Sequence, residues 1–148
     1  ALLNSAYVSF IGVDLTGRIS FFNKGAEAML GYKPEEVVGK KSPDIFHVPE
    51  EIAAKCAELS EKTGQHISSF GQYFEWITQN GEQVSDTWTY VRKDKGRLPV
   101  QMENVRMYDE KGNPIGGLGV AVDISQRMMA FSKLKEAHRQ LEILSAQL

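Results

Sequence analysis

The stretch that decides the fold is "YVRKDKGRLPVQMENVRMYDEKGNPIGGLGVAVDISQR", residues 90–127. It holds three β-rich, largely apolar runs separated by turn signals at 93–96 and 109–114. Apolar side chains alternate with polar ones at Leu98, Val100 and Met102, which indicates a strand with one buried face. The stretch therefore predicts an antiparallel meander of three strands, and a helix-like tail begins directly after it at Asp123.

The N-terminal half adds two strands and a series of short helices. Residues 7–14 and 18–23 are apolar and β-rich on either side of a turn, so we predict a hairpin. Helical spacing and capping signals predict four helices after it. They are expected at 24–30, 34–39, about 49–63 and, from a Ser68-Ser69 start to an Asn80-Gly81 stop, about 70–79.

Length and composition limit the function classes. The 148 residues suit one domain plus an appendage, and a net charge of −2 argues against nucleic acid as a partner. No apolar run is long enough to cross a bilayer, so we expect no membrane insertion. A single cysteine, Cys56, excludes an internal disulfide and favours a cytoplasmic location. The chain lacks an initiating Met and ends within a helical pattern, so we expect it to be part of a longer protein.

The tail, residues 124–148, has no Gly or Pro and is predicted to be one helix that follows a sheet domain at 1–123. Its apolar residues recur at alternating spacings of four and three, which is a short heptad pattern. Two interpretations stay open: an amphipathic helix that packs on its own sheet, and a helix that dimerises, which we favour. The heptad residues are Ala130, Leu134, Ala137, Leu141, Leu144 and Leu148.

Two motifs resemble those of PAS domains. Residues 12–40, "GVDLTGRISFFNKGAEAMLGYKPEEVVGK", are similar to the beginning of that family, and residues 109–125, "DEKGNPIGGLGVAVDIS", to its last hairpin, with Asp123-Ile124-Ser125 in place of the family's Asp-Ile-Thr. The resemblance covers roughly residues 5–127. It implies an α+β PAS fold: a five-stranded antiparallel sheet, short helices on one face around a cavity, and a C-terminal amphipathic signalling helix.

The chain departs from the family pattern at two places. Asp94-Lys95-Gly96 stands where the family usually has Asp-Gly, so a different turn is expected there. An extra segment lies before the meander, as in PAS domains attached to cyclic-dinucleotide synthases and sensor kinases. The resemblance therefore implies a sensory domain of a bacterial signalling protein whose own chain carries an output domain, such as a diguanylate cyclase or a histidine kinase. No catalytic motif occurs, so we expect no catalysis by this part of the chain.

By similarity to the family, one set of side chains is expected to point toward the helices and to line a pocket for a small molecule. The alternative is that they fill a packed core, so that the domain is a ligand-free dimerisation and relay module. The expected pocket residues are Met29, Leu30, Trp88, Tyr90, Val100, Met102, Gly119 and Ala121.

The other face of the last strand carries Leu118, Val120 and Val122. We expect this face to be covered by Leu2-Leu3, by the tail helix or by a second subunit, which would give a homodimer through the sheet and the terminal helices, with Leu134, Leu141 and Leu148 in the seam. 

Signal relay is assigned to the junction between sheet and tail. Asp123 is the predicted N-cap of the tail helix, and Gln126 is expected to reach back as in a capping box, with Ser125 between them. A movement of the last strand would then pass directly to the helix.

The sequence leaves the cofactor open. Flavin photochemistry is disfavoured because 41–45, where the family's reactive cysteine would fall, has none, and Cys56 is expected to be a buried side chain. Haem is disfavoured because His47 and His66 both lie outside the body of the third helix; His47 is expected to organise the start of that helix and His66 to lie in a polar loop. His138 is expected to face solvent. No metal site is predicted.

Overall fold

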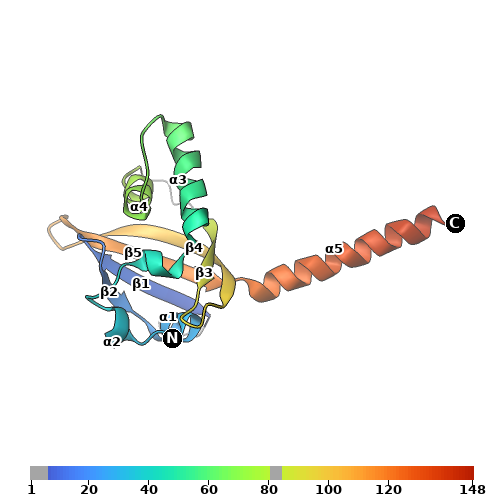
Figure 1. Ribbon diagram of the computed structural model, residues 1–148, viewed down its shortest axis with the longest axis horizontal. Helices are drawn as coiled ribbons and strands as arrows, with labels where there is room; N and C mark the ends of the chain where they lie inside the picture. Colours follow the sequence, from blue (N-terminus) through green and yellow to red (C-terminus); the bar gives the residue numbers. More distant parts are fainter. Residues whose placement is uncertain (1–6, 81–84) are drawn as a thin grey trace.

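The computed structural model describes residues 7–80 and 85–148, and its centre is one antiparallel sheet of five strands (Figure 1). The strand order is β2-β1-β5-β4-β3. The sheet, the short helices and the long C-terminal helix confirm the predicted α+β PAS fold. The strands are β1 (Val8–Asp14), β2 (Ile19–Phe22), β3 (Asp86–Val91), β4 (Arg97–Tyr108) and β5 (Pro114–Asp123).

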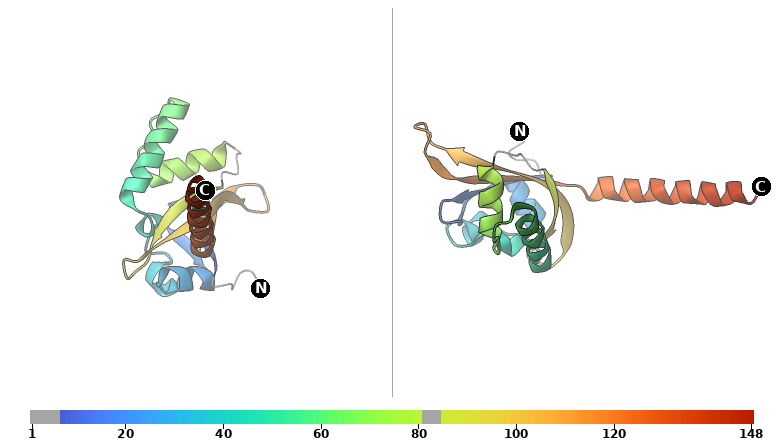
Figure 2. Two further views of the ribbon diagram at one scale, coloured as in Figure 1. Left: turned by 90° about the vertical axis from the view of Figure 1, so that its right-hand side faces the viewer. Right: turned by 90° about the horizontal axis from the view of Figure 1, so that it is seen from above.

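The helices between β2 and β3 form the second layer (Figure 2). A 3-10 turn, η2 (Pro43–Phe46), was not expected from the sequence. Gly81, the expected end of the fourth helix, lies outside the described residues. The helices are α1 (Lys24–Leu30), α2 (Pro34–Val37), α3 (Pro49–Thr63), α4 (Phe70–Gln79) and α5 (Ser125–Ala146).

The pairing register fixes which side chains face the helical layer. Ala121 of β5 lies opposite Ser9 on β1 and Met102 on β4, and Met102 lies opposite Asp86 on β3. Because side chains alternate along a strand, every second residue from these positions shares the inner face. That face carries Ser9, Ile11, Val13, Trp88, Tyr90, Val100, Met102, Asn104, Arg106, Gly117, Gly119 and Ala121.

Asn23 joins three elements at the point where the chain leaves the sheet. Its Oδ1 accepts from the N–H of Phe10 at 2.9 Å and from that of Ala26 at 2.8 Å, and its Nδ2 donates to the carbonyl of Val8 at 3.2 Å. The side chain therefore caps α1 and also pairs the backbone of β1 beyond the end of β2. Asn23 is buried, so these backbone groups have no water to replace it.

Helix α3 is fastened to β3, which is an edge strand. Glu51 accepts from the N–H of Thr89 at 2.6 Å and from its hydroxyl at 2.9 Å. One turn later the Lys55 ammonium contacts Asp86 at 2.6 Å and lies 4.5 Å from the ring centre of Trp88. These contacts protect the outer backbone of β3 and hold α3 beside the sheet.

Three hairpins use the same five-residue loop, at 14–18, 92–96 and 109–113. In each loop, the backbone N–H of the first residue donates to the carbonyl of the fifth residue. The N–H of the fourth residue donates to the carbonyl of the first residue. Gly17 and Gly112 hold the fourth position with φ of 85° and 84°. Lys95 holds it in the remaining loop with φ of 74°, a conformation that an L side chain adopts at a cost. The departure at Asp94-Lys95-Gly96 therefore puts a lysine at the position with positive φ. The hydrogen bonds of this loop are the same as those of the other two hairpins, so the different turn expected there is not found.

The junction between β5 and α5 differs from the predicted one. The N-cap of α5 is Ile124, which has no capping side chain, so the prediction of Asp123 as N-cap is wrong. Asp123 instead accepts from the N–H of Ser125 at 2.9 Å and from its hydroxyl at 2.6 Å. Gln126 is exposed and makes no capping-box bond. Ile124 is buried, and its N–H donates to the carbonyl of Pro99 at 3.1 Å.

Helix α5 leaves the sheet and projects away from it (Figure 1). None of its residues is buried, and the side chains of Leu134 and Leu141 are 69% and 64% exposed. The interpretation of the tail as a helix that packs on its own sheet is therefore wrong. Val122, on the outer face of β5, is 40% exposed. Leu2-Leu3, another candidate cover for that face, lies outside the described residues.

Replacement of Asn23 by Ala removes three hydrogen bonds and leaves buried backbone groups unpaired. We expect Asn23→Ala to lower the free energy of unfolding by about 3 kcal/mol. The control is Asn113→Ala, at an exposed position of the last hairpin, where a change within about 0.5 kcal/mol is expected. Urea denaturation followed by circular dichroism measures both values, and equal effects of the two substitutions would contradict this role of Asn23.

Lys95→Gly should stabilise the domain, since glycine adopts a positive φ without a steric penalty. We expect the free energy of unfolding to rise by up to about 1 kcal/mol. The matched control is Lys111→Gly in the equivalent loop, where Gly112 already takes the positive φ. That substitution adds only flexibility to the unfolded chain and should destabilise by about 0.5–1 kcal/mol. Thermal unfolding of the two variants should show shifts of opposite sign.

Candidate functional site

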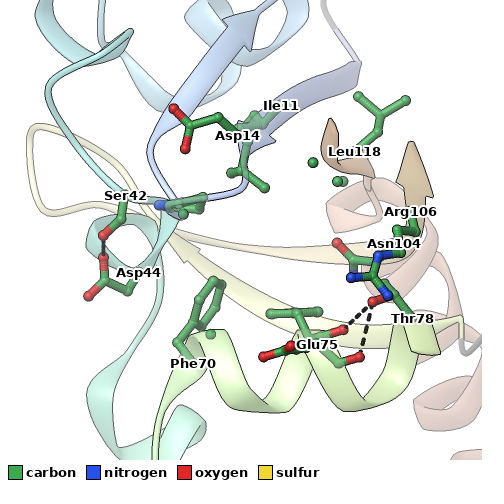
Figure 3. Close-up of a pocket in the computed structure, with 18 of the residues that line it drawn as sticks. Ile11, Asp14, Ser42, Asp44, Phe70, Glu75, Thr78, Asn104, Arg106 and Leu118 are labelled. Carbon is green, nitrogen blue, oxygen red and sulfur yellow. Dashed lines mark hydrogen bonds between the residues drawn. The ribbon is translucent and has the colours of Figure 1, made fainter. Parts of the chain in front are cut away.

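A cavity of about 530 Å³ lies between the inner face of the sheet and the helices (Figure 3). Its walls come from β1, β3, β4 and β5, from the turn that follows β1, from η2 and from α4. This volume falls within the range typical of small-molecule pockets. The lining includes Ile11, Val13, Asp14, Ser42, Asp44, His47, Phe70, Phe74, Glu75, Thr78, Tyr90, Met102, Asn104, Arg106, Gly117, Leu118 and Gly119. Leu118, which was predicted for the covered outer face of β5, thus also contributes to the cavity wall.

Glycines in β5 provide the floor of the cavity. Gly117 and Gly119 stand on the inner face, opposite Arg106 and Asn104 of β4. A Cβ at Gly119 would lie 3.0 Å from Oδ1 of Asn104, so that amide lies close over the strand where a side chain would otherwise be. A Cβ at Gly117 would meet only ordinary contacts at 3.5 Å. The sequence thus leaves space over β5 that larger inward-facing residues would fill.

His47 forms part of the wall and is 4% exposed. Its ring centre lies 4.7 Å from that of Phe70, 4.9 Å from that of Trp88 and 5.3 Å from that of Tyr90. Nδ1 is sealed from solvent and has no hydrogen-bond partner among the described residues. Burial, and secondly the charge of Lys55, lowers the pKa of His47 from its usual 6.5 to about 3. The imidazole is therefore neutral at physiological pH.

The polar groups of the wall fall into two sets. At one end Asp14 accepts from the hydroxyl and N–H of Thr16, and chiefly this hydroxyl lowers the pKa of Asp14. Asp44 accepts from the Ser42 hydroxyl. At the other end lie Asn104 and Arg106, whose side chains make no hydrogen bond or ion pair with each other or with the acids of the described wall. Figure 3 shows the two ends on opposite sides of the cavity.

The predicted pocket residues divide between the wall and the packed core. Tyr90, Met102 and Gly119 line the cavity. Burial raises the pKa of Tyr90, so its phenol stays protonated. The remaining five are buried without lining the cavity: Met29, Leu30, Trp88, Val100 and Ala121.

Sequence reasoning missed much of the wall. Asn104 and Arg106 follow Val100 and Met102 at every second position along β4. The alternation of inward-facing residues, extended from Met102 to Arg106, therefore identifies both of them. His47 was expected to organise the start of α3. The structure instead places its ring among aromatic side chains, and the N-cap of α3, Val48, has no capping side chain. No periodicity marks this position, because it depends on η2.

The other candidate residues for cofactor chemistry are now placed. Cys56 is buried as expected, and burial raises the pKa of its thiol. Of the two histidines considered for iron, His47 lines the cavity and His66 is exposed outside it. His138 is exposed and contacts Glu142 at 3.2 Å. Within residues 7–80 and 85–148 no group of three or more metal-ligating side chains occurs, and no helix is long and apolar enough to span a bilayer.

Fold and cavity together define a single-sheet α+β domain built around a space large enough for a small molecule. The family described as "PAS domain" matches residues 6–126, which is most of the chain. The chain therefore belongs to the PAS domain family. No curated protein sequence matches it.

Solved structures show the same fold. The PAS domain of a protein from Colwellia psychrerythraea is 23% identical with a TM-score of 0.58, over 85% of this chain and 92% of that one. An RNA-binding light-oxygen-voltage receptor is 14% identical with a TM-score of 0.66, over 93% of this chain and 35% of that one. The PAS domain of an HTR-like protein from Haloarcula marismortui is 19% identical with a TM-score of 0.56, over 84% of this chain and 87% of that one.

The neutral state of His47 predicts a pH dependence of stability. Below its usual pKa of 6.5 the unfolded chain binds a proton at His47 that the folded chain does not bind until about pH 3. The His47 contribution to stability therefore falls as the pH drops from about 6.5 to 3, by roughly 4 kcal/mol in all. His47→Phe, which keeps an aromatic ring, should remove this part of the acid sensitivity.

The measurement is urea unfolding of wild type and His47→Phe at several pH values from 7 to 4. Because both proteins keep the same carboxylates, the difference between the two curves isolates His47. His66→Gln, in the exposed loop, should follow the wild-type curve. Parallel curves for wild type and His47→Phe would show that His47 does not carry the effect.

Proposed function

We propose that this domain is the sensory module of a multidomain bacterial signalling protein and binds a small molecule in the cavity between sheet and helices. The observation that carries the proposal is that the floor of the cavity is β5, the strand that leads into α5. An output domain in the same chain, such as a diguanylate cyclase or a histidine kinase, would receive the signal from α5. PAS domains are sensory rather than catalytic, so catalysis is assigned to the output domain.

The relay is assigned to the last residues of β5. Gly119 lines the cavity, and Asp123 lies four residues further along the same strand. Asp123 fixes Ser125 at the first turn of α5, and Ile124 is held by burial and by the carbonyl of Pro99. A ligand that displaces β5 at Gly119 would therefore also displace the start of α5.

A homodimer is the second part of the proposal, supported by exposed apolar surface. The heptad leucines of α5 are not covered by any of the described residues, and the outer face of β5 is partly open at Val122. A second copy could cover both through the sheet and the terminal helices. This surface also supports the alternative function, a ligand-free dimerisation and relay module.

Native mass spectrometry of the domain, before and after exposure to a metabolite mixture, tests both parts. We expect a dimer that carries the added mass of a small molecule. Gly117→Leu places a side chain in the cavity and should abolish the added mass but not the dimer. Leu134→Glu with Leu141→Glu should give a monomer that still carries the ligand, since neither residue lines the cavity.

Val122→Leu, on the outer face of the same strand as Gly117, is the control and should retain the added mass. A dimer without added mass under all conditions would favour the ligand-free relay module. Retained mass in Gly117→Leu equal to that of wild type would place the ligand outside the cavity. A monomeric wild type would remove the dimer from the proposal.

A further inference from the structure

The wall of the cavity has unused hydrogen-bond donors at one end. Arg106 is half-buried on the inner face of β4, and no carboxylate of the described residues lies within ion-pair distance of it. Asn104, two residues before it, shares that face, and Gly117 and Gly119 opposite leave both side chains room over the floor. A guanidinium and an amide side by side form a donor set suited to a carboxylate.

The acids of the wall do not compete for these donors. Asp14 is occupied by its own turn, Asp44 by the hydroxyl of Ser42, and Glu75 accepts from the amide of Gln79 at 3.2 Å. Asp44 and Glu75 are also exposed, so they can remain hydrated. Among the charged groups of the described wall, Arg106 is therefore the one without a hydrogen-bond or ion-pair partner, although three acids line the same cavity.

The middle of the cavity is aromatic and apolar. Phe70 and Phe74 of α4 have ring centres 4.6 Å apart, and the Phe70 ring lies tilted against the imidazole of His47, with ring centres 4.7 Å apart. Met102, two residues before Asn104 on the inner face of β4, also lines the cavity. Both phenylalanines are half-buried, so part of each ring is open to a ligand. Flat aromatic groups pack well against such rings, at centre-to-centre distances of about 4.5–7 Å.

We propose that the cavity binds an aromatic carboxylate, with its carboxylate on Arg106 and Asn104 and its ring against Phe70 and Phe74. This inference rests on the proposed ligand-binding function and names the chemical class of the ligand. Arg106 supplies the charge, and Asn104 fixes the orientation of the carboxylate. The aromatic cluster selects a flat body over an aliphatic one.

Isothermal titration calorimetry with matched probes tests this assignment. The acids are benzoate, phenylacetate and 2-naphthoate, and each is compared with its neutral amide; 2-naphthylmethylamine is the cationic probe. We expect at least one acid to bind, and its amide and the amine to bind at least about tenfold more weakly. Chemical-shift changes on binding should centre on Gly117, Gly119 and the side-chain amide of Asn104.

Arg106→Gln should weaken the acid by about tenfold or more and leave the amide unchanged. Arg106→Lys, which keeps the charge without the planar fork, should give an intermediate affinity and guards against a simple folding defect. The control is Arg97→Gln, an exposed position at the start of the same strand, which should bind like wild type.

The outcomes separate this inference from the proposed function. If the amide or the amine binds as tightly as the acid or more tightly, the carboxylate assignment is overturned. If Gly117→Leu abolishes that binding, the cavity is still supported as the ligand site. Failure of all three acids would also overturn it, while a small molecule retained by wild type and lost in Gly117→Leu would still support the proposed function. Acid binding that survives Arg106→Gln would overturn the role of Arg106.

Discussion

The architecture depends on how the chain leaves the sheet after β2. Strand β2 has only four residues, whereas β1 continues to pair with β5 from Val8 to Asp14. The backbone of β1 beyond β2 would be unpaired and buried if nothing replaced the missing strand. The side chain of Asn23 makes these bonds and caps α1 at the same time. One amide thus allows the chain to turn from the sheet into the helical layer without loss of backbone hydrogen bonds.

The helical layer does not fill all the space over the inner face of the sheet. Around Phe46 the aromatic rings of Phe22, Tyr32 and Tyr90 pack into a continuous core. Two inward positions of β5 are glycines, Gly117 and Gly119, and the helix that lines the cavity is α4, whose Phe70 and Phe74 are half-buried. Space remains where inward side chains are absent, so the cavity is a consequence of the Gly-rich sequence of β5. Core and cavity therefore share one face of one sheet.

The sequence predicted the order of elements because hydrophobic period and turn residues are local signals. The sequence-based prediction was wrong where a tertiary contact determines where a helix starts or which way a side chain points. Asp123 has the side chain of an N-cap, but the burial of Ile124 against the sheet moves the start of α5 one residue on. Likewise His47 occupies the cavity wall because η2 turns its ring inward, and no local pattern records that turn. The wall residues of β4 were predictable in principle, since Asn104 and Arg106 follow Met102 at every second position and so share its face of the strand.

The geometry of the junction limits how a signal could travel. Among the described residues, the start of α5 is held by the bonds of Asp123 to Ser125, by the burial of Ile124 and by a hydrogen bond from Arg127 to Gln101 at 3.5 Å, and no residue of α5 is buried. A shift of β5 by a fraction of an ångström would therefore change the direction of α5 without breaking any packing along its length. A lone helix would swing through solvent as a rod, and no neighbouring helix would register the change. Pairing of the exposed leucines with those of a second copy would convert the change in direction into a relative movement of two helices, so the proposed dimer is the physical condition for the proposed relay.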